Sequence, residues 1–546
     1  MSASDKKKLR KEQEAAMLTE KQRQEQAEAK KLKTYTTIFV AVMALVVLIS
    51  VVSLVVSGIN KSGVFEKNTI AATVGDHKLN TVELSYYYND AINNMYNTAY
   101  EQYSSYYELY FDAIGLDTSK PLDEQTNPET KDTWANFFVD SALESAKSDY
   151  TIAKLAADAG FSLPQEEQDS IDNNLKNIET MAKINSGLSA DSYLSMIYGA
   201  GADMDSYRTY LERTALAEAY YAEHLDSLSY DDAAIREYDK DHTDDFNSYN
   251  FSYSYMSYTE FQEGGTEDED GNKTYSEEEK AAAREALKKA AEEMATAKTL
   301  DELKEKAEKV DVNENSQVAV NSETNVMHTS LNATLADWLA DSSRKEGDIA
   351  AIPNVSSEGD DKVTNGYYVA YFVSKTDNKT AMGNVRHLLV EFEGGTEDGD
   401  TGEMVYTDEE KAVAKTEAEE LLKQWKDGEA TEESFIELIK EHSDDTSAEE
   451  GGLFEDINPD SDYVPNFLNW SIDADRKEGD VEIIETEFGY HIMYYVGASE
   501  LNYRDHLITE EMKTTDQDAW YEGALKDITT ETKDLSRMRL NAVISG

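Results

Sequence analysis

The chain contains no cysteine. This absence excludes disulfide bonds, thiolate metal sites and a lipid anchor attached through cysteine, and it fits an exported protein. Basic residues are also few, with 51 Lys and Arg against 111 Asp and Glu, and the formal net charge is -60. A nucleic-acid-binding protein needs a basic surface to replace counterions. We therefore predict that no nucleic acid is a partner.

Histidine is rare as well, with eight in 546 residues. The length allows three or four domains. A hydrophobic content of 40% supports sizeable cores, which argues against wholesale disorder.

The N-terminal region predicts a membrane anchor. Residues 1–34 hold ten Lys and Arg, and residues 35–59 carry no charge and are mostly aliphatic. About 20 apolar residues cross a bilayer as a helix, and flanking basic residues stay in the cytoplasm. We expect a basic cytoplasmic tail at 1–34, a single-pass transmembrane helix at 35–59 and an extracytoplasmic remainder. A cleaved signal peptide is the alternative, but its apolar region would be only about 7–15 residues long.

Residues 64–245 predict a mainly helical domain after a short strand-like piece at 70–79. Gly160, Pro164 and Gly187 separate the expected helices, which lie at about 132–158, 164–184, 189–197 and 203–225. The chain holds 34 tyrosines, many of them just after Thr81. They indicate either an adaptable surface that holds unfolded clients or ordinary half-buried packing.

A module of about 120 residues occurs twice, at 250–375 and 383–500. Residues 274–280 match residues 405–411 at an offset of 131, and Trp338 with 344–348 matches Trp470 with 476–480 at an offset of 132. Residues 366–372 match 489–495 at an offset of 123. Three ordered matches of this kind indicate an internal duplication.

Both copies predict the same order of elements. A strand leads through an acidic loop to a helix that begins with a capping box, Ser276/Glu279 or Thr407/Glu410. A shorter helix follows, and a β-rich segment closes each copy after a Glu-Gly-Asp turn. This pattern predicts an α+β fold in which helices cover a sheet. Residues 501–546 then predict one or two helices.

The copies differ where chemistry is expected. Only the second copy has a histidine in each terminal strand, His387 and His491, together with the aspartates and the double glycine of residues 443–454. Tyr368 stands in the first copy where the second has His491. We expect one active module and one degenerate module that serves structure or binding.

The second copy resembles a parvulin-type peptidyl-prolyl isomerase domain. The resemblance covers about 115 residues and several ordered motifs: Arg-His-Leu-Leu-Val, Ser-Asp-Asp-x-Ser-Ala, Gly-Gly-Leu, Tyr-Val-Pro-x-Phe, Glu-Gly-Asp and Phe-Gly-Tyr-His-Ile. The plan of the whole chain is similar to the PrsA and SurA class of extracytoplasmic foldases. In that class a helical chaperone domain, here 64–245, is completed by a C-terminal helix, here within 501–546.

The resemblance implies the site. Its catalytic residues would be His387, Asp445, His491 and Thr486. Its proline-binding residues would be Leu453, Tyr463, Phe467 and Phe488. Tyr463 replaces a frequent methionine of the family, and Phe454 replaces a glycine. The resemblance implies no cofactor and no metal.

Two other kinds of site remain as alternatives. His387, His491 and Asp445 together could bind a metal ion, although the chain shows no ligand spacing such as His-x-x-x-His. The acidic loop at 268–272 could attract calcium, but it lacks the twelve-residue ligand pattern. The corresponding acidic loop of the second copy argues against recognition of phosphorylated substrates.

We therefore expect a membrane-anchored, extracytoplasmic peptidyl-prolyl isomerase and foldase that acts on X-Pro segments of unfolded exported polypeptides. A holdase or scaffold whose modules bind peptides without turnover is the alternative. An extracellular protein that binds calcium or cell-wall material is a third hypothesis.

Overall fold

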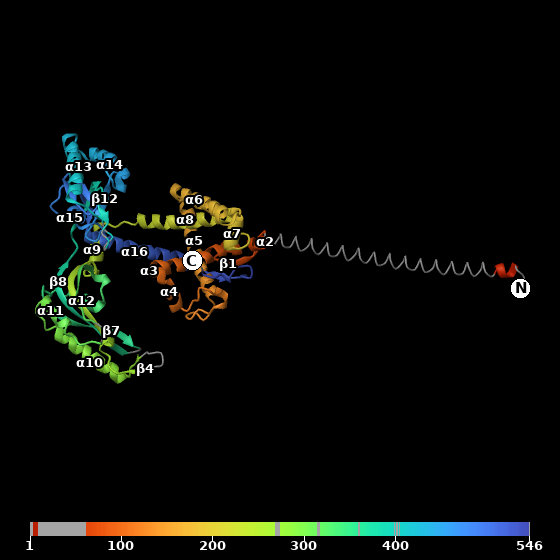
Figure 1. The fold of residues 1–546 in the computed structure, drawn as a ribbon, viewed down its shortest axis with the longest axis horizontal. Coiled ribbons are helices and arrows are strands. Elements are labelled where there is room, and N and C mark those ends of the chain that lie inside the picture. Colours follow the sequence, from red (N-terminus) through yellow and green to blue (C-terminus); the bar gives the residue numbers. More distant parts are fainter. Residues whose placement is uncertain are drawn as a thin grey trace. The chain divides into compact units, whose positions relative to one another are not determined.

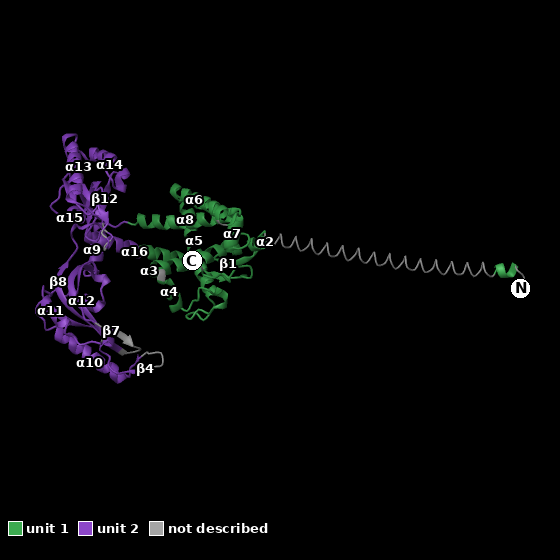
Figure 2. Cartoon of the chain, in the orientation of Figure 1, with its two compact units in different colours: residues 1–228, 516–546 green, residues 229–515 purple. Residues whose placement is uncertain are grey.

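A computed structural model describes residues 4–8, 62–267, 273–313, 317–358, 361–397, 399, 402 and 404–544. The chain divides into two compact units (Figure 2). The first comprises Met1–Leu228 with Asp516–Gly546, and the second comprises Ser229–Thr515. The predicted anchor at 35–59 lies outside the described residues. Among the described residues no helix is long and apolar enough to cross a membrane.

The first unit is mainly helical (Figure 1). The predicted separators end and begin its helices: Gly160 caps a helix with a φ of 74°, Gly187 has a φ of 63°, and Pro164 precedes the next helix. Its helices include α2 (Val64–Asn68), α3 (Thr81–Tyr103), α4 (Tyr107–Ala113), α5 (Trp134–Ala159), α6 (Gln165–Met181), α7 (Ala190–Tyr198) and α8 (Met204–Ser227).

A small antiparallel sheet joins the two ends of this unit. Strand β1 (Ile70–Val74) lies between β2 (His77–Asn80) and β15 (Thr530–Thr532). The helix predicted within residues 501–546 is present as α16 (Tyr503–Leu525), but the strand that follows it was not predicted. Helix α16 (Tyr503–Leu525) ends before Thr530, where β-branched residues pair with β1.

Tyrosines occupy the core of the first unit as well as its surface. Tyr86 and Tyr88 are almost completely buried, and Tyr86 contacts the rings of Tyr198, Tyr207 and Tyr210. Other tyrosines, toward the end of α3 and beyond, are exposed.

The second unit begins with α9 (Asp232–Asp241), so the predicted helical domain, which extended to residue 245, ends earlier in the structure, at Leu228. Two modules follow. The first module contains β3 (Ser248–Ser257), β4 (Thr266–Glu267), β5 (Lys273–Thr274), α10 (Glu277–Met294), α11 (Leu300–Ala307), β6 (Asn321–Met327), α12 (Ala333–Ala340), β7 (Ile349–Glu358) and β8 (Asp361–Thr376).

The second module repeats this series. Its elements are β9 (Ala381–Glu391), β10 (Thr396–Glu397), β11 (Met404–Val405), α13 (Asp408–Asp427), α14 (Glu432–His442), β12 (Leu453–Ile457), α15 (Pro465–Ser471), β13 (Val481–Glu485) and β14 (Gly489–Asn502). The two main sheets have the equivalent orders β6-β3-β8-β7 and β12-β9-β14-β13. All their strand pairs are antiparallel.

Helices cover both faces of the second module's sheet. Helices α13 and α14 pack on the face that carries Leu388 and Ile492. Helix α15 packs on the opposite face through Phe467 and Trp470. The capping boxes predicted at Ser276 and Thr407 begin α10 and α13 as expected.

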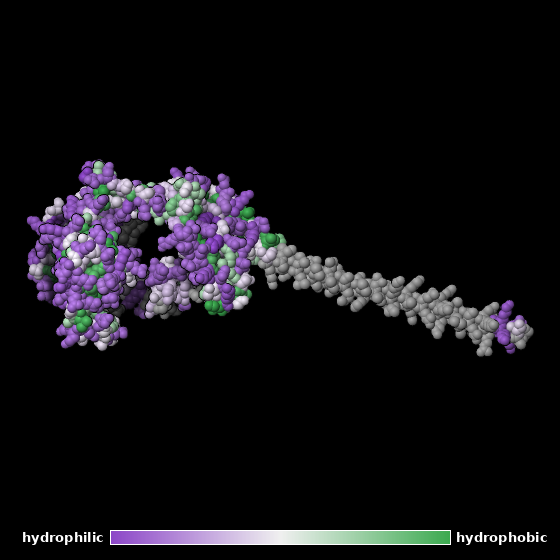
Figure 3. Space-filling model, turned by 90° about the horizontal axis from the view of Figure 1, so that it is seen from above, coloured by the Kyte–Doolittle hydropathy of each residue, from purple (hydrophilic) through white to green (hydrophobic). Residues whose placement is uncertain are grey.

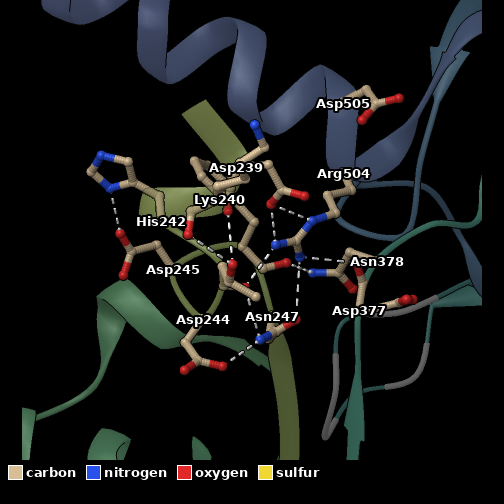
Figure 4. Close-up of polar contacts among 12 residues, drawn as sticks. Asp239, Lys240, His242, Asp244, Asp245, Asn247, Asp377, Asn378, Arg504 and Asp505 are labelled. Carbon is tan, nitrogen blue, oxygen red and sulfur yellow. Dashed lines mark hydrogen bonds and ion pairs between the residues drawn. The ribbon is translucent and has the colours of Figure 1, made fainter. Parts of the chain in front are cut away.

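Helix α16 begins at a buried polar cluster within the second unit (Figure 4). Arg504, which is 2% exposed, donates to the side chains of Asp239 and Asn247 and to the backbone carbonyls of Thr243 and Asp377. These partners come from α9, the loop between α9 and β3 and the segment between β8 and β9. The Arg504 guanidinium therefore connects three chain segments in the region where the two modules meet. Hydrophilic residues dominate the surface visible in Figure 3.

Candidate functional site

Two neighbouring strands bring the predicted histidines together. In the antiparallel pair β9–β14, His387 lies opposite Met493 and His491 lies opposite Leu389. Residues two apart on a strand share a face, so the histidines are diagonal neighbours on the face covered by α15. Their Nδ1 atoms are 2.9 Å apart, and their rings stack with centroids 5.2 Å apart. Both are buried, at 2% and 5% exposed.

Polar groups extend this histidine pair in both directions. His387 Nε2 lies 3.5 Å from a carboxylate oxygen of Asp445 and 3.4 Å from Ser447 Oγ. At the other end, His491 Nε2 lies 2.9 Å from the hydroxyl of Thr486. The result is a continuous chain of hydrogen-bonding groups across the site.

Hydrogen bonds hold both rings in place. The Thr486 hydroxyl accepts from the backbone N–H of Phe488 and lies 2.9 Å from His491 Nε2 and 3.5 Å from the carbonyl oxygen of Gly489. One Nδ1 of the histidine pair donates to the other, and His387 Nε2 faces Asp445 and Ser447. Every ring nitrogen of the pair therefore has a polar partner.

Burial and neighbouring charges set the ionisation of the pair. Burial, together with the nearby His387, lowers the pKa of His491 from 6.5 to about 4. The hydrogen bond from His387 holds the pKa of Asp445 well below its ordinary value of 3.8, and Ser447 adds to this effect. At neutral pH His491 is therefore uncharged and Asp445 is a carboxylate.

A tight turn presents Asp445 to the histidines. Asp445 caps the short 3-10 helix at Thr446–Glu450, and its carboxylate accepts hydrogen bonds from Ser447. The double glycine that follows has φ values of 78° and 62°. A Cβ on Gly452 would lie 2.4 Å from the carbonyl oxygen of His387. Only glycine fits here because of this close approach.

An aromatic pocket of about 590 Å³ opens beside the pair. Phe467 is buried, and its ring centroid lies 5.3 Å from that of His387 and 5.6 Å from that of His491. Tyr463 and Phe488 are 36% and 55% exposed and form the outer part of the pocket. The complete lining is His387, Asp445, Phe454, Asp462, Tyr463, Val464, Pro465, Phe467, Phe488 and His491.

One predicted wall residue lies elsewhere. Leu453 pairs with Arg386, so it points to the face covered by α13 and α14, away from the pocket. The next residue, Phe454, pairs with Val385 and takes the wall position instead. The alternation of faces along β12 explains this correction.

Ser447 and Asp462 are site residues that were not predicted from the sequence. Ser447 belongs to the Ser-Asp-Asp-x-Ser-Ala motif, but the motif did not indicate a role for its side chain. Asp462 precedes Tyr463 in a loop, and no sequence pattern indicated that its side chain would line the pocket.

The first module has tyrosines at the two histidine positions. In the pair β3–β8, Tyr253 lies opposite Ala370 and Tyr368 lies opposite Tyr255. This is the diagonal arrangement of His387 and His491, so Tyr253 is equivalent to His387 and Tyr368 to His491. The two tyrosine rings lie 6.0 Å apart. No imidazole pair forms at this position.

The described residues contain no group of three or more His, Asp or Glu side chains arranged to hold a metal ion. The acidic segment 268–272, considered for calcium, lies outside the described residues.

Residues 387–497 match the family model described as Rotamase: PPIC-type PPIASE domain. No curated protein matches the chain. The structure of the peptidylprolyl isomerase PrsA from Bacillus anthracis is 20% identical over 28% of this chain and 59% of that one, with a TM-score of 0.17.

Two further PrsA structures are similar. That from Bacillus cereus is 22% identical over 28% of this chain and 50% of that one, with a TM-score of 0.17. That from Bacillus subtilis is 14% identical over 75% of this chain and 93% of that one, with a TM-score of 0.27. The chain thus spans 59% and 50% of the first two relatives. The assignment of the second module rests on the family match and on the geometry of the site.

Proposed function

Because residues 387–497 form a PPIC-type peptidyl-prolyl isomerase domain, we propose that the whole chain is a membrane-anchored, extracytoplasmic isomerase and foldase for exported proteins. The observation that carries this proposal is the buried His387–His491 pair beside an aromatic pocket. Pair and pocket lie within the residues that match the family.

Rotation about an X-Pro bond passes a barrier of about 18–20 kcal/mol because the twisted amide loses its resonance. No covalent bond breaks, so the site needs no nucleophile. The enzyme must bind the twisted amide more tightly than either planar form. Each tenfold acceleration requires about 1.4 kcal/mol of this difference.

The pocket suits this task. The proline ring would lie against Phe467 and Tyr463, where apolar contact favours it. The histidine pair forms the buried base of the site, and its nitrogens are already satisfied within the hydrogen-bond chain. It therefore acts as a fixed polar surface, preorganised before substrate arrives. Asp445 supplies the fixed negative charge at one end.

The proposed location rests on the sequence. Residues 35–59 have the length and apolar character of a membrane-spanning helix, and the basic residues of 1–34 favour a cytoplasmic N-terminus. Protease digestion of intact cells tests this topology. Loss of the second module's epitope with survival of an N-terminal epitope is the expected result, and full protection of both would contradict it.

The enzymatic proposal is tested by the isomerisation of a short proline peptide with the full chain in detergent. We expect acceleration over buffer, and a large loss in the His387→Ala and His491→Ala variants because each breaks the hydrogen-bond chain. The matched control is Tyr368→Ala at the equivalent position of the first module, which should leave the rate unchanged. No acceleration by the folded wild-type chain would refute isomerase activity.

A holdase function is the second candidate, and exposed apolar side chains in the first unit favour it. Around the end of α3 and the start of α4, Tyr100, Tyr103, Tyr106 and Leu109 are 52%, 45%, 69% and 64% exposed. Large exposed apolar groups close together are typical of protein-binding surfaces. Suppression of client aggregation that falls in the Tyr106→Ser and Leu109→Ser variants, with isomerisation unchanged, would support this function.

A further inference from the structure

The loop that forms part of the pocket is hydrogen-bonded to the first module. Asp460 lies in the segment between β12 and α15. Its carboxylate accepts a hydrogen bond of 2.6 Å from the side-chain amide of Asn325, which lies on β6 of the first module. Its other oxygen accepts a hydrogen bond from the hydroxyl of Tyr503, the first residue of α16. One carboxylate therefore joins three parts of the second unit.

Asn325 is directed toward Asp460 by a β-bulge. The register of β6 against β3 shifts between Tyr249 and Phe251, so that residues 324 and 325 lie opposite Asn250. Asn325 has a φ of 55°, a left-handed conformation that asparagine tolerates better than most residues. Its backbone N–H donates to the Asn250 side chain at 2.7 Å. A bulge of this kind re-aims a side chain.

A short series of hydrogen bonds leads from Asp460 to the pocket. The backbone N–H of Asp460 donates to the side chain of Asn458, and Ser461 donates to the carbonyl of Asn458. The backbone N–H of Tyr463 then donates to the carbonyl of Ser461 at 2.9 Å. Asp462 and Tyr463 line the pocket, two and three residues beyond Asp460. These hydrogen bonds connect Asp460 to the residues that form the outer wall of the pocket.

Tyr503, the second hydrogen-bond partner of Asp460, is itself held by surrounding contacts. Tyr503 is 1% exposed, and its backbone N–H donates to the carbonyl of Thr380. The adjacent Arg504 makes the buried cluster shown in Figure 4. The start of α16 is thus a firm support for the Asp460 carboxylate.

We propose that the degenerate first module positions the proline-binding wall of the second module through the Asn325–Asp460 hydrogen bond. Asn325 and Asp460 are positioning residues, since neither lines the pocket. The proposal rests on the proposed function in one respect, that the pocket is the proline site. It gives the tyrosine-bearing module a role in substrate binding without turnover of its own.

The test exchanges the two side chains in the full chain. Asn325→Asp keeps a residue that tolerates the bulge, but it sets a second carboxylate against Asp460. Asp460→Asn removes the charge and keeps an oxygen that can accept from Tyr503. The double variant Asn325→Asp/Asp460→Asn restores one amide donor and one carboxylate acceptor in the reverse direction. Thr324→Asp, which adds the same charge one residue earlier in the bulge, is the matched control.

Two quantities are measured for each variant: the Kd of a labelled proline peptide by fluorescence anisotropy, and the KM and kcat for its isomerisation. We expect Asn325→Asp to raise Kd and KM about three- to fivefold with kcat nearly unchanged, because coupling through such contacts is modest. The double variant should return to within about twofold of wild type. Thr324→Asp should bind as wild type does.

The outcomes separate the two proposals. Equal Kd values for wild type and a correctly folded Asn325→Asp variant would overturn the positioning role, as would failure of the double variant to recover. A wild-type chain that binds the peptide without turnover would refute isomerase activity, while the Kd comparison would still decide the positioning role. A general loss of stability would lower the melting temperature of the single and double variants alike, without recovery.

Discussion

Replacement of His491 by glutamine should reduce the dependence of the second unit's stability on acid pH. In the folded chain the pKa of His491 is about 4, below its ordinary value of 6.5, chiefly because of burial. Between these two values the unfolded chain binds the proton and the folded chain does not. Stability from this group is therefore complete above about pH 6.5 and falls as the pH drops toward 4.

The size of the effect follows from the two pKa values. Over the full window the difference corresponds to about 3 kcal/mol, and at pH 5 to about 2 kcal/mol. The pKa of Asp445 is also lowered, but from 3.8, so its contribution is lost only in stronger acid. Between pH 5 and pH 7 the titration of His491 is therefore separate from that of Asp445.

Urea unfolding of the full chain at pH 7 and pH 5 measures this contribution. The wild type should lose about 2 kcal/mol more on acidification than His491→Gln does. His442→Gln, at a half-buried histidine at the end of α14, serves as the control and should behave as the wild type. A ring resonance of His491 that titrates near 6.5 by NMR, or equal pH dependence in wild type and His491→Gln, would refute the argument.

Two further substitutions test the buried polar groups. Thr486→Val removes the hydroxyl that hydrogen-bonds with His491 Nε2 and leaves this buried nitrogen without a partner. We therefore expect a loss of about 1–3 kcal/mol in urea unfolding and slower isomerisation. Thr486→Ser should retain both stability and rate, and a Val variant as stable as wild type would contradict the contribution of this hydrogen bond. Arg504→Met leaves the Asp239 carboxylate without its buried partner, and a loss of about 3 kcal/mol is expected by calorimetry. Lys513→Met, at an exposed ion pair on the same helix, should change stability by less than about 1 kcal/mol.

Local sequence signals predicted the elements of the fold well. The capping boxes at Ser276 and Thr407 begin helices where expected, because the N-cap and the residue three positions later satisfy the first backbone N–H groups. Gly160 ends α5 in a left-handed conformation that favours glycine. These signals depend on neighbouring residues alone, so they can be read without knowledge of tertiary contacts.

Features that depend on strand register could not be predicted from the sequence. The motif around Gly-Gly-Leu suggested Leu453 as a pocket wall, yet the side-chain face in β12 is set by pairing with β9, and Phe454 takes that place. The third strand of the small sheet, β15, could not be foreseen either, because three residues at Thr530–Thr532 acquire their structure only by pairing with β1. The histidine pair was predicted because two motifs and an internal repeat agreed on it.

Comparison of the two modules also shows where the hydrogen-bond donor for Asp460 comes from. Both modules contain the same bulge: Asn325 and Asp456 each have a positive φ and each donates a backbone N–H to an equivalent asparagine, Asn250 or Asn384. At the bulge of the first module an amide is present, which can donate to Asp460. A carboxylate, as at the bulge of the second module, has no proton to donate at neutral pH. The equivalent bulge position is therefore an amide in the first module, which lacks the histidine pair, and a carboxylate in the second module, which has it. The wild-type chain therefore has its donor at the bulge of the first module and its acceptor at Asp460, and the double variant Asn325→Asp/Asp460→Asn tests whether the reverse polarity serves equally well.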